Sequence, residues 1–196
     1  MTAGYDRHGP ANRWHRLLAP LLAMLLLTGG CAPVFLAAGA GVGYYAGNKK
    51  AARKVDRFFH DLAASIRTSS RRTTGARQTE KRFGRDKGAG ARIRLEKSVL
   101  VPARVARGEQ VTTVITYAVL GAPAGGVRVE ETRELWLDNR KLSLLRRETI
   151  TRKNGTWEST LVFRVPRTAK PGHYRVVEHV RLGDSGLRAD NGFTVD

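Results

Sequence analysis

Cys31 is the single cysteine of this 196-residue chain, and its surroundings single it out as a residue with a chemical role. It follows the small residues Thr28-Gly29-Gly30, which end an apolar run that begins at Leu17. Three arginines precede the run, so the order is positive, apolar and small, as in a secretory signal that is removed after export. We therefore read residues 1–30 as a signal peptide rather than as structure. A lone cysteine also excludes an internal disulfide framework.

Two histidines are the next candidates for chemistry. His173 and His179 lie six residues apart in a segment that reads as one strand. Both would then project from the same face, about 20 Å apart at roughly 3.3 Å per residue. That separation is too large for a shared metal ion, so we expect no metal site.

An acidic group near the middle of the chain gives no better catalytic site. Glu130, Glu131 and Glu134 are interleaved with Arg128 and Arg133. This mixture predicts a solvated strand face with cross-strand ion pairs. No glycine-rich phosphate loop precedes a helix, and no serine occupies a nucleophile elbow. We expect a non-enzymatic protein that needs no cofactor.

The segment around Cys31 resembles the signal and lipobox of bacterial lipoproteins. The resemblance implies that the Cys31 thiol is diacylated, that the preceding bond is cut, and that Cys31 becomes the lipidated N-terminus. The sequence departs from the family at Thr28, where Leu is usual, and here Leu27 stands one place earlier. Ala32 rather than Asp follows the cysteine, which by the same resemblance implies the outer membrane where the host has two.

An uncleaved membrane anchor with an incidental cysteine is the alternative for this segment. No charged residue occurs between Leu17 and Lys49, and a spanning helix needs only about 20 apolar residues. Two prolines, Pro20 and Pro33, and the Gly29-Gly30 pair interrupt the run and favour the lipoprotein interpretation.

Three glycines follow the cysteine at four-residue spacing, at Gly39, Gly43 and Gly47. On a helix they would form one small-residue face that permits close helix packing in lipid. Residues 31–47 resemble the glycine zipper found near the N-terminus of many envelope lipoproteins. A flexible spacer beside the acyl chains is the alternative.

Positive charge is concentrated before the last hundred residues. The formal net charge is +18 overall; residues 49–94 contain 15 Lys or Arg against 4 Asp or Glu, and residues 95–196 contain 17 against 12. Residues 48–66 show the spacing of an amphipathic helix, with Phe58 and Phe59 on its apolar side. Such a helix next to a lipid anchor lies at a membrane interface; the alternative is that its phenylalanine face packs on the following domain.

Residues 67–91 contain almost no large apolar side chains and predict a disordered basic linker. We expect this tether, helix and linker together, to contact anionic lipid or an envelope polyanion, whereas an exported protein seldom meets nucleic acid. A simple solvated spacer is the alternative for the linker. The candidate contact residues are Lys49, Lys50, Arg53, Lys54, Arg57, Arg71 and Arg72.

Residues 92–196 predict about seven short strands and therefore an all-β sandwich. Asn154-Gly155 between two apolar segments predicts a β-hairpin with a type I′ turn. The turn into a strand at His173 and Tyr174 resembles bacterial immunoglobulin-like or fibronectin-type-III-like domains. That resemblance makes Tyr174 a tyrosine corner, and Trp136 and Trp157 are the candidates for the large core aromatic.

Together these features predict a membrane-anchored lipoprotein of the bacterial cell envelope that faces the periplasm and presents an immunoglobulin-like binding module. We expect a protein or an envelope polymer as its partner. The alternative is a membrane-assembly component driven by Gly39, Gly43 and Gly47, in which the sandwich is a structural cap.

Overall fold

The computed structural model describes residues 49–84 and 90–196. The predictions made for the signal peptide, for Cys31 and for Gly39, Gly43 and Gly47 lie outside the described residues. Within the described ranges, no helix combines the length and apolarity that a membrane span requires.

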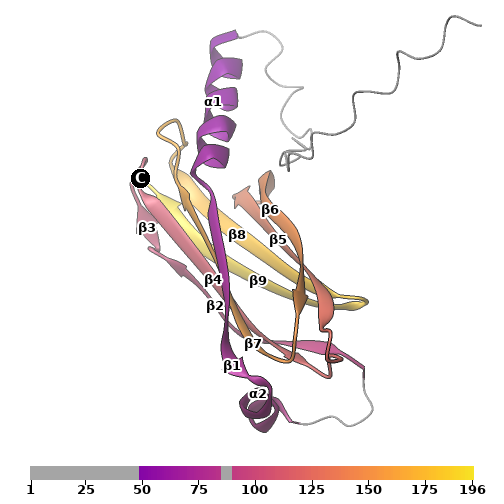
Figure 1. Cartoon of the computed structure of the whole chain (residues 1–196). Coiled ribbons are helices and arrows are strands. Elements are labelled where there is room, and N and C mark those ends of the chain that lie inside the picture. Colours follow the sequence, from indigo (N-terminus) through magenta and orange to yellow (C-terminus); the bar gives the residue numbers. More distant parts are fainter. Residues whose placement is uncertain (1–48, 85–89) are drawn as a thin grey trace, which may run out of the picture. The chain divides into compact units, whose positions relative to one another are not determined.

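The described chain folds into two facing β-sheets (Figure 1), which confirms the predicted all-β sandwich. The four-stranded sheet has the order β1-β7-β4-β2 and the five-stranded sheet the order β3-β9-β8-β5-β6. Neighbouring strands are antiparallel except for β3 and β9. The bounds are β1 Arg67–Gly75, β2 Arg92–Val101, β3 Arg104–Val105, β4 Gln110–Leu120, β5 Val127–Leu137, β6 Arg140–Arg152, β7 Gly155–Arg164, β8 Gly172–Leu182 and β9 Ser185–Val195.

The connections are those of an immunoglobulin-like sandwich with one addition. Strands β2, β4 and β7 form one sheet, and β5, β8 and β9 form the other, joined by β6 at its edge. Tyr174 at the start of β8 donates a hydrogen bond from its hydroxyl to the Lys170 carbonyl at 2.9 Å, as the tyrosine corner predicts. The addition is β1, which lies beside β7 where constant-type immunoglobulin domains place a later strand.

Strand β1 corrects the prediction of a disordered linker over residues 67–91. Residues 67–75 pair with β7 from Arg67 opposite Val162 to Gly75 opposite Gly155. Their side chains are almost all exposed, so burial could not reveal the strand. An edge strand is held by its backbone hydrogen bonds, and β-branched threonines suit that conformation.

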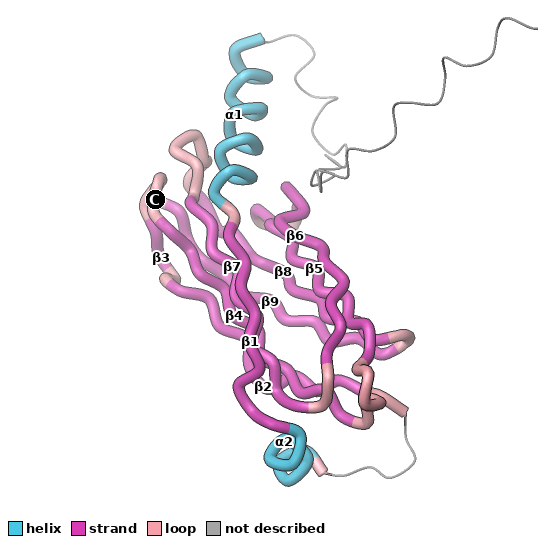
Figure 2. The backbone as a smooth tube through the Cα atoms, viewed as in Figure 1, coloured by secondary structure: helices cyan, strands magenta, loops and turns pink. Residues whose placement is uncertain are grey.

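Two helices lie at opposite ends of the sandwich (Figure 2). Helix α1 spans Lys49–Ser65, within the predicted helix, and buries Leu62 at its C-terminal end in the core. Helix α2 spans Ala76–Phe83 inside the supposed linker. It buries Thr79, whose hydroxyl donates to the Gly75 carbonyl at 3.0 Å and lies 3.1 Å from the Thr156 hydroxyl.

The predicted hairpin at Asn154-Gly155 is wrong, because β6 and β7 belong to different sheets. This segment crosses between the sheets instead. The Asn154 side chain accepts from the Ala122 amide at 2.7 Å and donates to the Ala122 carbonyl at 3.0 Å, which fixes the crossing to the loop after β4. The side-chain amide of Asn154 therefore pairs with a backbone peptide group, as a neighbouring strand would, and does not form a turn.

The two tryptophans are not the core aromatics that the sequence suggested. Trp136 and Trp157 are both only half-buried. Among the described residues the buried rings are Tyr117, Phe163, Phe193 and Tyr174, and Phe193 stacks on Tyr174 with ring centroids 5.5 Å apart.

Gly155→Val should lower the melting temperature by several degrees, but not for the turn-related reason that the hairpin implied. Gly155 has φ 140°, and a Cβ there would lie 2.5 Å from the Thr74 carbonyl oxygen on β1. Such overpacking destabilises a fold by about 1 to 3 kcal/mol. Gly75→Ala is the matched control, since its added Cβ meets no atom within 4 Å. Equal melting of both variants would contradict the pairing of β1 with β7.

Candidate functional site

The densest group of charged side chains in the described chain forms a layer inside the core. Along the inward face of β8, Glu178 stands between Val176 and Val180, and along β5 the pair Glu131 and Arg133 interrupts the apolar residues. Other strands also carry polar side chains on their inward faces at this height of the sandwich. The polar layer, as we call it, comprises Ser98, Thr113, Tyr117, Glu131, Arg133, Arg152, Ser159, Glu178 and Asn191.

The polar layer separates two apolar clusters of the core. The cluster at the α1 end contains Phe163, Tyr174 and Phe193. The other cluster, toward α2, contains Ile115 and Val180. Along the inward faces of β5 and β8 the core is thus apolar, polar and apolar in succession, and on β4 Tyr117 belongs to both the layer and the second cluster.

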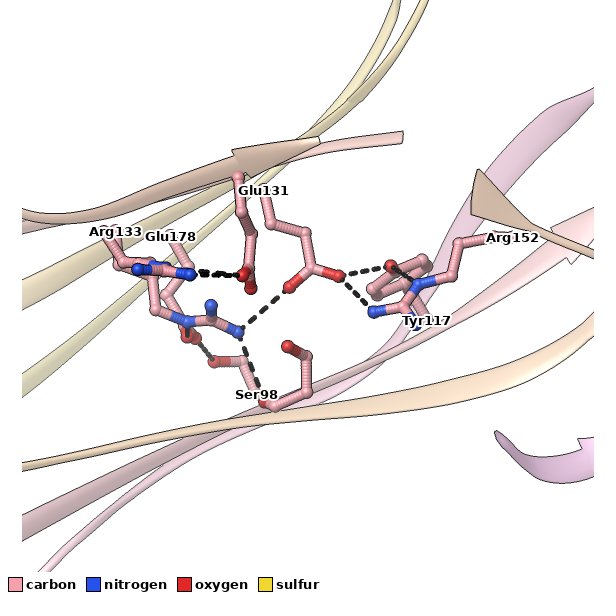
Figure 3. A network of polar contacts seen from close by, with 9 residues as sticks. Ser98, Tyr117, Glu131, Arg133, Arg152 and Glu178 are labelled. Atoms are coloured by element: carbon pink, nitrogen blue, oxygen red, sulfur yellow. Dashed lines mark hydrogen bonds and ion pairs between the residues drawn. The ribbon is translucent and has the colours of Figure 1, made fainter. Parts of the chain in front are cut away.

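Arg133 on β5 is the centre of the layer (Figure 3). Its Nε donates to Glu178 Oε1 at 2.9 Å, and its Nη2 donates to Glu131 Oε2 and to the Ser159 carbonyl, each at 3.3 Å. The side chains of all three charged residues are only 1% exposed. One guanidinium group therefore joins two carboxylates and reaches the opposite sheet.

Arg152 at the end of β6 completes the charge balance. Its Nη2 donates to Glu131 Oε1 at 2.8 Å and its Nε to the Tyr117 hydroxyl at 3.1 Å. The Tyr117 hydroxyl donates to the same carboxylate oxygen at 2.6 Å. The guanidinium carbon lies 4.5 Å from the ring centroid of Trp157, so this half-buried tryptophan covers the layer at one side.

On the other side, the layer ends at β2 and β9. Ser98 donates to the second oxygen of Glu178 at 2.8 Å, and Asn191 lies 2.5 Å from the Ser98 hydroxyl. The carboxylate of Glu178 is thereby bonded on both oxygens. The polar layer thus has members on seven strands, β2 and β4 to β9, and links the two sheets.

The electrostatics keep these groups in fixed protonation states. Burial by itself would raise the pKa of Glu131, but Arg133 and the hydrogen bonds from Tyr117 and Arg152 hold that pKa below its ordinary value of 4.5. Burial and the Glu131 charge raise the pKa of Tyr117 well above its ordinary range. Glu131 is therefore ionised and Tyr117 protonated at neutral pH, and the two carboxylates are matched by two guanidinium groups.

The layer corrects the prediction of a solvated strand face for this part of β5. Glu131 and Arg133 point inward, whereas Glu130 and Glu134 on the outward face are half-buried. Glu134 does make the expected surface pair, with Lys141 Nζ at 2.5 Å. Glu131 and Arg133 continue the two-residue spacing of the inward-facing apolar residues of β5. That spacing indicates that they face the core, but charged residues are normally assigned to the surface.

The residues predicted to contact an anionic surface divide between two elements. Lys50, Arg53, Lys54 and Arg57 are exposed on α1, which Lys49 begins. Arg71 and Arg72 lie on β1 instead of in a linker. Arg71 is ion-paired with Glu158 at 2.7 Å, and the Arg72 stem packs beside Gly155.

The two histidines lie on the outer face of β8, as their spacing predicted. His173 pairs in register with Thr194, and its ring lies over Gly192, where an added Cβ would be 2.7 Å from Cε1. His179 is in register with Arg188. No group of three metal-ligating side chains occurs within residues 49–84 and 90–196.

The same outer face carries an ordered array around Trp136. The Trp136 indole donates to Glu134 Oε2 at 3.1 Å, and the Arg175 guanidinium lies 5.8 Å from its ring centroid. Arg175 also donates to Asp190 Oδ2 at 2.8 Å. Unlike the polar layer, this array of paired polar and aromatic side chains is partly exposed to solvent.

Comparison with models of known protein families and with curated proteins gives no match. Solved structures share only the general arrangement. A CARDB domain from Pyrococcus furiosus is 14% identical, covering 54% of this chain and 90% of its own, with a TM-score of 0.38. A Niemann-Pick type C2 protein from the Japanese carpenter ant is 8% identical over 58% of this chain and 100% of its own, with a TM-score of 0.40. A β-glucosidase from Erythrobacter marinus is 10% identical over 54% of this chain and 16% of its own, with a TM-score of 0.39.

Glu131→Gln should lower the free energy of unfolding by about 3 to 5 kcal/mol, because it leaves Arg133 and Arg152 buried with one carboxylate. Glu130→Gln, one residue earlier on the outward face, is the control and should change it by less than about 0.5 kcal/mol. Chemical denaturation of the three proteins measures this. Equal losses for both variants would contradict the buried position of Glu131.

The pKa of Glu131 also predicts an acid-dependent stability. Because its folded-state pKa is lowered, the unfolded chain binds the proton first. The stabilisation is complete above the ordinary pKa of 4.5 and is lost as the pH falls through the lower folded-state value. Glu131→Gln should therefore show a weaker fall in stability on the acid side, measured by urea melts between about pH 3 and about pH 7. Parallel pH profiles for wild type and variant would refute the assignment.

Proposed function

We propose that this protein is a non-catalytic binding module of the bacterial cell envelope. Acylated Cys31 holds it at the membrane on the periplasmic side, and the outer membrane is its place in a host with two membranes. The sandwich recognises a protein or an envelope polymer.

The observation that carries the non-catalytic assignment is the sealed polar layer. General acid–base or nucleophilic catalysis requires a group that reaches substrate and can change its protonation state. Glu131, Glu178 and Arg133 are 1% exposed, and Arg133 binds both carboxylates. These charges are paired inside the sandwich and leave recognition to its surface.

The outer face of the five-stranded sheet is the best-suited recognition surface. Trp136 and Arg175 offer an aromatic and a planar cationic group, which are the side chains most often central to binding energy. Hydrogen bonds to Glu134 and Asp190 hold them in place, so little ordering entropy is lost on binding.

The lipidation of Cys31 is tested first. The intact mass of protein from the membrane fraction should correspond to a chain that begins at Cys31 and carries two or more acyl chains, because one chain alone binds membranes only marginally. Cys31→Ser should move the protein out of the membrane fraction after a high-salt wash. A chain that begins at Met1, or a Cys31→Ser protein that stays firmly bound, would show that the segment is an uncleaved anchor.

The recognition surface is tested with the full chain immobilised against isolated envelope polymers and solubilised envelope proteins. A partner retained by the wild type should be lost with Trp136→Ala and kept with Val99→Ala, an exposed apolar position on the opposite sheet. Retention by both variants, or retention of nothing by the wild type, would contradict this part of the proposal.

A further inference from the structure

The end of the sandwich from which α1 projects carries four exposed cations, three on two loops and one at the end of a strand. Arg107 belongs to the loop between β3 and β4, and Arg164, Arg167 and Lys170 lie at the end of β7 and in the loop before β8. We call these four residues the collar. Within the described residues no ion pair engages any of them; the nearby carboxylate of Glu109 accepts from the Ala106 amide.

Backbone contacts hold the two collar loops together. The Gly108 amide donates to the Val165 carbonyl at 2.7 Å, and Arg164 Nη1 donates to the Gly108 carbonyl at 3.3 Å. The Arg167 side chain passes beside Gly108, 3.6 Å from where a Cβ would stand. The like charges are therefore fixed near one another by the fold.

The foot of α1 is joined to this same end. The Ser65 hydroxyl accepts from the Arg164 amide at 3.0 Å and donates to the Leu62 carbonyl at 2.7 Å. Leu62 is 1% exposed and packs in the apolar cluster that contains Val165. The helix is thus fixed to the sandwich, and the collar surrounds its foot.

The first turns of α1 extend beyond the sandwich and keep part of their apolar face. Val55 lies two helical turns before Leu62 and so on the same face. Val55 and Phe59 are only half-buried. Arg53, Lys54 and Arg57 are exposed on the remaining sides together with Asp56 and Asp61, so the basic residues of the helix outnumber the acidic ones. An apolar stripe with flanking cations is the pattern of a helix that lies in a membrane interface.

We infer that the collar and the projecting part of α1 form one surface that rests on an anionic membrane. This inference deepens the proposed function, on which it rests, by giving the sandwich a defined orientation. Helix α1 has 17 residues and is about 25 Å long, so an upright helix would hold the collar well beyond a Debye length of about 8 Å from the headgroups. A helix lying in the interface brings the collar to headgroup level.

Charge complementarity selects an anionic membrane as the occupant. Each Lys or Arg near such a surface strengthens binding about fivefold, and the effect falls off as salt rises. The prediction from sequence placed this contact in the tether alone. The structure adds cations that belong to the sandwich and lie 35 or more residues beyond Arg72, the last of the predicted contact residues.

The test uses the mature chain from residue 31 with Cys31→Ser, so that neither acylation nor the apolar run that begins at Leu17 contributes to vesicle binding. Arg107→Gln, Arg167→Gln and Lys170→Gln are combined, leaving Arg164 with its bond to Gly108. Binding to vesicles of phosphatidylcholine with phosphatidylglycerol should weaken at least tenfold at low salt, and the dependence on salt should become less steep. Vesicles of phosphatidylcholine alone should bind wild type and variant equally weakly.

The control removes three exposed cations at the other end of the sandwich, by Arg128→Gln, Lys153→Gln and Arg181→Gln. It should weaken binding less than threefold, because those positions face away from the membrane. An equal loss in both triple variants would show a general charge effect and overturn the inference, as would unchanged binding of the collar variant.

A second measurement reports the orientation directly. In the Cys31→Ser chain, which has no other cysteine, Lys170→Cys or Asp184→Cys carries an environment-sensitive fluorophore. Emission should shift to the blue on anionic vesicles for the label at 170 and stay constant for the label at 184, in the turn between β8 and β9. A shift at 184 alone or at neither position would overturn the proposed orientation. The lipidation of Cys31 is tested separately by the mass of the membrane-bound protein.

Discussion

The two carboxylates that Arg133 joins are the interaction on which the rest of this structure depends. Burying Glu131, Glu178, Arg133 and Arg152 is expensive in desolvation, and mutual pairing only offsets that loss. What the arrangement supplies is specificity. A one-residue slip of β5, β6 or β8 would turn its inward charge to the outside and leave the partners unpaired, so the layer favours one register of these three strands.

The fold class and the alternation of the later strands could be predicted because they rest on local pattern. The β-branched residues of β4 predict a central strand, and the position of Tyr174 predicts the tyrosine corner at the start of β8. The polar layer could not be predicted with the same rules. A charged residue is assigned to the surface unless its partners are known, and the partners of Glu131 come from strands that lie 14 to 21 residues away.

Two of the wrong assignments, the disordered linker and the hairpin, share one physical cause, which is that backbone hydrogen bonds leave little trace in side-chain composition. Strand β1 is polar and basic because only its backbone is needed beside β7. Asn154 looks like a turn former, although its amide pairs with the backbone of Ala122. Strand β1 has no apolar pattern, and the pattern around Asn154 fits either a hairpin or a crossing between sheets. Long-range contacts decide the structure in both cases. The anionic-surface residues on α1 were visible from spacing alone, but the collar was not, because its loops meet only in the folded chain.

The position of β1 at the edge of the sheet has a mechanical consequence. A pull on the chain before α1 enters the sandwich at Arg67 and runs along β1, whose partner β7 lies antiparallel beside it. The hydrogen bonds of that ladder stand across the direction of pull, so the load is shared by all of them instead of opening them one after another. The strand that sequence composition presents as a loose spacer is thus the part of the molecule best placed to carry tension between an anchor and a bound partner.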